Sequence, residues 1–158
     1  MTPEQAELIL KRKAGFVPFY KALMPTLVEF VERLGISHSH LVLKNAEEFA
    51  PYISDALQDL VVHNDPERTR LLMRVGYFIG EYFSQKYGGC WYLDDIERSR
   101  YFSRYVVGRF SKLLDNSCMI DPFEIAKDFV DSSSPRGLCN LLASVEKELL
   151  DCVRKSVN

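Results

Sequence analysis

The sequence predicts a mainly α-helical protein of the α+β class, a single-domain helical bundle with one small β-hairpin near residues 90–110. Proline and helix-capping residues punctuate the chain at positions 3, 45, 66, 122 and 135, as they do where helices begin. Between these positions, apolar residues recur at three- and four-residue spacing, which is typical of amphipathic helices. The length of 158 residues suits one domain, and because no linker-like stretch divides the chain, we expect residues 1–158 to fold together.

Three helices are expected in the first 65 residues. Pro3 suits the first helical position, and Gly15 is expected to end the first helix. Pro25 is expected to kink or divide the second helix. Asn45, with Glu48 three residues later, matches a capping box that starts the third. The expected ranges are helices at 3–13, at 18–34 and from 45 onward, with a loop or brief extended segment at 37–45.

Residues 66–87 are expected to form the longest and central helix. Asp65-Pro66 is a suitable start, and an apolar stripe follows along one face. Gly76 and Gly80 lie four residues apart on one side, although an interior glycine destabilises a helix by about 1 kcal/mol relative to alanine. We infer that another backbone approaches this helix closely at the two glycines.

The pair Gly88-Gly89 is expected to end the central helix with a positive φ, a conformation that glycine adopts readily. The stretch CWYLDD (90–95) then predicts a strand, and YFSRYVVGRF (101–110) its hairpin partner, although a helix is the competing interpretation of the second stretch. Trp91, the only tryptophan, is expected to lie in the core over the end of the central helix.

Two further helices are expected near the C-terminus. Asp121, Pro122 and Glu124 combine a cap, a proline and a capping-box glutamate, which predicts a helix over residues 122–131. Ser134-Pro135 is expected to start the last helix, whose inward face is rich in leucine.

The composition of the chain argues against several functions, namely nucleic-acid binding, membrane attachment and secretion. A net charge of −2 gives no long-range attraction to nucleic acid or to an anionic membrane. No apolar run approaches the ~18 residues of a membrane span, and the N-terminal charges follow a short apolar stretch, the wrong order for a secretory signal. Because no C-x-x-C pair occurs, the cysteines are expected to be free and mostly buried thiols. Together, these observations lead us to expect a cytoplasmic protein without membrane attachment. The cysteines are Cys90, Cys118, Cys139 and Cys152.

No pattern predicts catalysis, a cofactor or a metal site. The chain has no nucleophile elbow of the G-x-S-x-G type and no glycine-rich phosphate loop. His38 and His40 lack a Cys or Glu at a familiar metal-ligand spacing. Asp94, Asp95 and Glu97 are interpreted as a charged hairpin turn. We therefore expect no enzymatic activity.

Glu81 adjoins Gly80 and lies close to the apolar stripe of the central helix. A partly buried carboxylate there requires a partner, and an arginine or a backbone N–H group would serve. A structural pair is favoured over a general base because no companion catalytic residue accompanies Glu81.

Residues 71–150 contain the stretches GYFIGEYFSQKYGG, CWYLDD, YVVGRF and IDPFEIAKDFV. This series resembles a group of small bacterial domains with the loose pattern G-x-x-x-G-E, G-G-x-W and a later D/N-P-F that opens a helix. Domains of this kind are encoded near secreted toxins, where they often serve as immunity proteins. The resemblance implies a cytoplasmic immunity or antitoxin-like inhibitor, and it transfers no catalytic residue.

Carboxylates gather on the third helix and the segment after it. Asp55 and Asp59 are four apart and are expected to share a helix face, where like charges are mildly destabilising, whereas Tyr52 is expected on the apolar face. Such a surface is either merely solvated or a docking surface for a basic protein partner, a toxin or an effector. The candidate partner-binding residues are Glu47, Glu48, Asp55, Asp59, Asp65 and Glu67.

The alternative function class is a nucleic-acid-binding or regulatory module that uses residues 98–112. Arginines interleaved with aromatic residues on a hairpin would suit single-stranded nucleic acid. The acidic balance of the whole chain argues against nucleic acid, and salt-bridged arginines on a solvated face are the simpler interpretation. A non-enzymatic protein-binding protein is therefore the first choice. The basic residues are Arg98, Arg100, Arg104, Arg109 and Lys112, and the aromatic ones Tyr101, Phe102, Tyr105 and Phe110.

Overall fold

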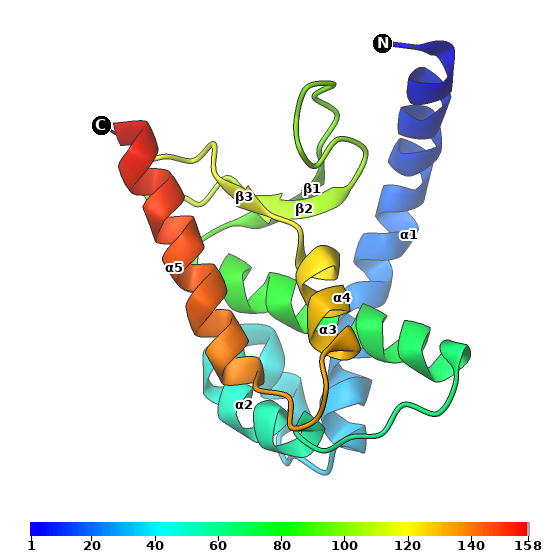
Figure 1. Ribbon diagram of the computed structural model, residues 1–158, viewed down its shortest axis with the longest axis vertical. Coiled ribbons are helices and arrows are strands. Elements are labelled where there is room, and N and C mark those ends of the chain that lie inside the picture. The colour runs from blue at the N-terminus through cyan, green and yellow to red at the C-terminus, as the bar shows by residue number, and fades with distance from the viewer. Residues whose placement is uncertain (158) are drawn as a thin grey trace.

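The computed structural model describes residues 1–157, and it confirms the predicted mainly α fold with a small β part (Figure 1). The described chain contains five α-helices, one short 3₁₀ turn (Ser39–Leu41) and one three-stranded antiparallel sheet in the order β1-β2-β3. The helices are α1 (Pro3–Arg33), α2 (Val42–Leu57), α3 (Asp65–Tyr87), α4 (Pro122–Asp131) and α5 (Leu138–Val157). The strands are β1 (Cys90–Leu93), β2 (Tyr105–Gly108) and β3 (Met119–Ile120).

α3 is the central helix, as predicted. It contacts α1, α2, α4, β1 and β2, and every residue from Val75 to Gly80 is buried. The Asn64 side chain caps the start of α3 by accepting the Glu67 N–H at 2.9 Å. Gly88 ends the helix at φ +68°, so the predicted left-handed stop is confirmed at this residue.

α1 is one helix of 31 residues, so the prediction of two helices separated near Gly15 is wrong. Pro18 and Pro25 lie inside it, although each proline removes one backbone hydrogen bond. A tertiary contact supports the segment: the Tyr105 hydroxyl donates to the Arg12 carbonyl at 2.6 Å. A Cβ on Gly15 would lie 2.8 Å from that hydroxyl, so this glycine makes room for the tyrosine and does not end the helix.

α2 begins one turn before the predicted cap at Asn45, so the loop expected at 37–45 is mostly helical. Asn45 nevertheless interrupts α2, because its φ of −130° and ψ of 45° are not helical. The Gln85 side-chain amide of α3 fills this break. It accepts the Ala46 N–H at 2.8 Å and donates to the Val42 carbonyl at 3.0 Å, two groups that bond to each other in a regular helix. Gln85 thereby fixes the start of α2 on α3.

The sheet has a shorter second strand than predicted and a third strand that the sequence did not indicate. The expected strand at 101–110 is confined to Tyr105–Gly108 because the chain before it turns back on itself. In this turn the Ser103 N–H donates to the Asp94 carbonyl at 2.7 Å, and Ser103 has φ +69°. The turn that was expected to be charged thus contains a buried carboxylate, since Asp94 is only 2% exposed.

α4 has the bounds that the sequence predicts, and the Asp121 side chain caps its start. α5 begins at Leu138 and not at the predicted Ser134-Pro135. The preceding residues instead bind the end of α2, where the Arg136 N–H donates to the Gln58 carbonyl at 2.9 Å. This contact ties the α4–α5 connection to α2.

Trp91 lies in the core, as predicted, and is 6% exposed, but it packs against Gly80 in the interior of α3 and not over the end of that helix. Three aromatic rings surround its indole, at centroid distances of 5.4, 6.1 and 5.8 Å. A Cβ on Gly80 would lie 1.9 Å from the indole. The close approach inferred at α3 is therefore real, but aromatic side chains make it and not another backbone. The surrounding rings belong to Phe19, Tyr77 and Phe123.

Cys118 and Cys152 form a disulfide, so the prediction of free thiols is wrong for these two residues. Their Cα atoms are 6.3 Å apart, a normal span for this bond, and the bridge ties the segment before β3 to α5. A separation of 34 residues carries no pairing signal in the sequence. Cys90 and Cys139 are free, as predicted, but exposed where burial was expected.

Candidate protein-binding surface

The outer face of α2 carries two carboxylates around an exposed tyrosine. Glu48, Tyr52 and Asp55 follow one another at four- and three-residue spacing, so they share one face of the helix. Asp59 is also exposed but lies in the turn beyond the end of α2, so the expected sharing of one helix by Asp55 and Asp59 is wrong. We call Glu48, Tyr52, Asp55 and Asp59 the acidic stripe.

The opposite face of α2 explains why these side chains point outward. Its buried residues recur at three- and four-residue spacing and pack into the core. Tyr52 was expected with them, but it is 64% exposed. The buried residues show which face of α2 meets the core. Position 52 lies on the opposite face, between two carboxylates. The buried residues are Val42, Ala46, Phe49, Ala50, Ile53 and Leu57.

Of the other three predicted carboxylates, two make local contacts, as does Asp59 of the stripe, which accepts the Ser134 hydroxyl at 3.1 Å. Glu47 binds Lys86 at 2.7 Å, and Lys86 also binds Glu146 at 2.7 Å. Burial opposes the charge of Lys86, but the two carboxylates outweigh it and raise the pKa of this lysine. Glu67 accepts the His63 N–H at 3.0 Å. The six predicted acids therefore divide into the acidic stripe, on α2 and the turn after it, and a separate set, which comprises Glu47, Asp65 and Glu67.

A hollow of about 390 Å³ adjoins the acidic stripe. Glu48 and Tyr52 form one wall, and Ile36 and Leu41 from the connection between α1 and α2 form another. Leu41 is 37% exposed, so the hollow offers an apolar surface to solvent. An apolar hollow beside an exposed aromatic ring and several carboxylates can take up an apolar side chain that is flanked by lysine or arginine.

Two arginines of the alternative nucleic-acid segment are bound to α4. Arg100 donates to Glu124 at 2.9 Å, and Arg104 donates to both Glu124 and Asp121. These hydrogen bonds, to Glu124 first and then to Asp121, raise the pKa of Arg104. Phe110 is fully buried and cannot stack on a base. The contacts agree with the simpler interpretation, in which the arginines form salt bridges on a solvated face.

Glu81 has neutral partners, and neither is the arginine or backbone N–H that was expected. The Trp91 indole donates to one carboxyl oxygen at 3.1 Å, and the Gln85 amide donates to the other at 3.4 Å. Burial raises the pKa of Glu81, and the two hydrogen bonds oppose this shift. The carboxyl group thus orients the indole, which is a structural role.

Comparisons with known proteins assign no family, because no protein-family model, curated protein or solved structure matches the chain. Among the helices of residues 1–157, none has both the length and the hydrophobicity to cross a membrane.

Proposed function

We propose that the protein is a non-enzymatic protein-binding domain that docks a basic protein partner on the acidic stripe of α2. The observation that carries this proposal is the position of Tyr52, which is 64% exposed between Glu48 and Asp55. Tyrosine is enriched among the few residues that dominate binding energy at protein interfaces. Because the ring does not pack into the core, it is free to contact another molecule.

The charges of the stripe favour a basic partner. Within residues 1–156, no lysine or arginine lies at ion-pair distance from Glu48, Asp55 or Asp59. Carboxylates that form no ion pair attract a basic surface over the Debye length, which is about 8 Å at physiological ionic strength. Such steering raises the association rate more than the affinity. The adjacent hollow then supplies the apolar contact that holds the complex.

In its narrower form, the proposal is a cytoplasmic immunity or antitoxin-like inhibitor of a bacterial toxin. Its support is the motif resemblance over residues 71–150 and the acidic stripe, which would suit a toxin that has a basic surface. Disulfides are rare in the cytoplasm, so the Cys118–Cys152 bridge removes one argument for that location. The narrower form therefore requires both thiols to be reduced in the cell. Alkylation of intact cells, followed by mass spectrometry, tests this, and an oxidised pair would contradict the cytoplasmic form.

A photo-crosslinking experiment tests the binding surface itself. We expect Tyr52→benzoylphenylalanine, expressed in the native host, to capture a defined protein with a basic surface. Glu7→benzoylphenylalanine is the matched control, because Glu7 is exposed on α1 near the N-terminus, at the opposite end of the molecule from α2 (Figure 1). Capture of the same protein from both positions, or from neither, would contradict a specific surface on α2.

A further inference from the structure

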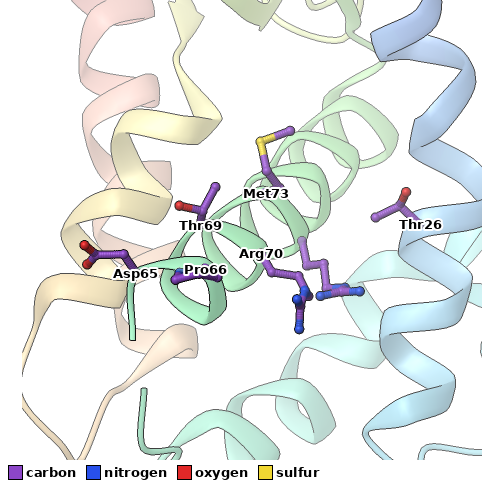
Figure 2. A pocket seen from close by; sticks show the side chains of 7 residues that line it. Thr26, Asp65, Pro66, Thr69, Arg70 and Met73 are labelled. Atoms are coloured by element: carbon purple, nitrogen blue, oxygen red, sulfur yellow. The ribbon is translucent and has the colours of Figure 1, made fainter. Parts of the chain in front are cut away.

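Two adjoining hollows lie where α1 passes the first half of α3, and the same two arginines line both. Arg70 and Arg74 of α3 border one hollow of about 560 Å³ and another of about 410 Å³. In Figure 2, the Arg70 side chain leaves α3 on the side that faces α1, and Thr26 points from α1 toward α3. Arg33 of α1 joins the two arginines around the second hollow. Three guanidinium groups thus border one continuous surface.

Within residues 1–156, no carboxylate lies at ion-pair distance from Arg70 or Arg74. Arg70 and Arg74 are four residues apart on α3, a spacing at which like charges destabilise a helix. Three carboxylates lie nearby: Glu29 binds Arg33 at 2.8 Å, Glu67 accepts a backbone N–H at 3.0 Å, and Asp65 lines the first hollow. The fold therefore leaves Arg70 and Arg74 without a direct ion pair, although carboxylates border both hollows.

Arg74 also holds a donor that lacks a partner. Its Nε atom is buried, and among the described residues nothing accepts a hydrogen bond from it. Burial lowers the pKa of Arg74, Glu29 opposes this shift, and the charges of Arg33 and Arg70 add to it. A buried donor without an acceptor is unfavourable, so an anion at this position would both supply the acceptor and relieve the repulsion.

Apolar side chains cover the rest of the second hollow. Val61 is 64% exposed and Leu60 is 39% exposed, so the hollow presents an open apolar wall next to the arginines. Contact with an apolar group would remove this wall from water. The lining includes Phe30, Leu34, Leu60, Val61 and Leu71.

We propose that Arg70 and Arg74 bind the oxyanion of an amphiphilic ligand, a phosphate or carboxylate group that carries an alkyl chain, and that the chain lies in the second hollow. Guanidinium groups match the geometry of phosphate and carboxylate through paired hydrogen bonds. The hollow beside them lies along the surface of α1 and α3, where an alkyl chain can follow the exposed apolar wall. This site is separate from the acidic stripe of α2 and does not depend on the function proposed for it.

Calorimetric titration with octyl phosphate, octanoate, inorganic phosphate and octanol tests both parts of the ligand. Octyl phosphate or octanoate is expected to bind at least about tenfold more tightly than inorganic phosphate and octanol, because only the first two use the arginines and the apolar wall together. The proposal would be overturned if neither octyl phosphate nor octanoate bound more tightly than inorganic phosphate, or if no saturable binding occurred.

The variant Arg70→Gln/Arg74→Gln tests the assigned residues. Losing one charge-assisted hydrogen bond weakens binding about tenfold, so the double variant is expected to bind octyl phosphate or octanoate about 100-fold more weakly. Arg154→Gln is the matched control, because that side chain is 77% exposed on α5. Unchanged affinity in the double variant would overturn the assignment.

A spectroscopic measurement on the wild-type protein does not depend on how the variant folds. In a ¹H–¹⁵N spectrum, the Nε–Hε signal of Arg74 is expected to shift when the tighter-binding of octyl phosphate and octanoate is added, because the buried donor gains an acceptor. The corresponding signal of Arg154 is expected to stay in place. An Arg74 signal that does not respond at saturating concentrations of that ligand would overturn the proposal.

Discussion

The substitution Gly80→Ala, in the middle of α3, has two opposite effects on stability: it improves helix propensity, and it overpacks the core. An added Cβ would lie 1.9 Å from one indole carbon of Trp91 and 2.3 Å from a second. Non-bonded carbon atoms normally stay about 3.5–4.0 Å apart, so one of the two groups has to move. The indole is enclosed by aromatic rings and donates a hydrogen bond to Glu81 at 3.1 Å, which leaves it little room.

The magnitude follows from two opposing terms. Alanine in place of glycine stabilises a helix interior by about 1 kcal/mol. Overpacking a well-packed core destabilises by about 1–3 kcal/mol, and so short a contact belongs at the upper end. We therefore expect Gly80→Ala to lower the free energy of unfolding by a net ~2 kcal/mol, or the melting temperature by about 4–8 °C.

A double-mutant cycle measured by urea denaturation checks the cause. Trp91→Phe removes the indole atoms that the new Cβ would meet, so Gly80→Ala should be much less destabilising in that background and can become stabilising. The reasoning would be refuted if Gly80→Ala stabilised the otherwise wild-type protein. An equal effect in both backgrounds would show that the contact with Trp91 is not its cause.

Three further predictions concern stability. Trp91→Ala should lower the free energy of unfolding by about 3–5 kcal/mol, and a melting temperature that stays unchanged would contradict its core position. The pKa of Glu81 in the folded protein is raised above its ordinary 4.5. The protonated carboxyl group therefore contributes its full stabilisation at lower pH, and this stabilisation is lost as the pH rises through the raised pKa. Unfolding curves over that range should show Glu81→Gln gaining stability relative to the wild type as pH rises, and a pH-independent difference would exclude this titration. Cys118→Ser should destabilise by about 3–4 kcal/mol, the loop-entropy value for a bridge of this length, relative to Cys139→Ser as the control. Equal stability of these two variants would argue against the disulfide.

The elements that the sequence predicts best have local start and stop signals. Residues 66–87 and 122–131 match α3 and α4 because proline and the caps at Asn64, Asp121 and Gly88 act within one helical turn. Local chemistry of this kind is visible in a single sequence.

The errors arise where a distant residue overrides the local signal. Gly15 did not end α1 because Tyr105, 90 positions later, packs on the helix there and donates to it. The cap expected at Asn45 became a break inside α2, since Gln85 of α3 satisfies the interrupted backbone groups. The disulfide partners are likewise remote in sequence.

The candidate surfaces were predictable only in part. The carboxylates of α2 were visible in the sequence, but the exposure of Tyr52 depends on which face of the helix meets the core. The spacing of Arg70 and Arg74 is also visible, whereas the approach of Arg33 requires the packing of α1 on α3.

The association rate of the protein captured at position 52 tests the proposed function most directly. Asp55→Lys/Asp59→Lys should slow association at low ionic strength by about tenfold or more, because charge steering reaches 10–10³-fold. The difference should shrink as salt is added, and the melting temperature should stay close to that of the wild type. Glu4→Lys/Glu7→Lys, which changes the same number of charges at the far end of α1, is expected to associate at nearly the wild-type rate. Equal association rates for the wild type and the Asp55/Asp59 variant at low salt would contradict a role for the acidic stripe.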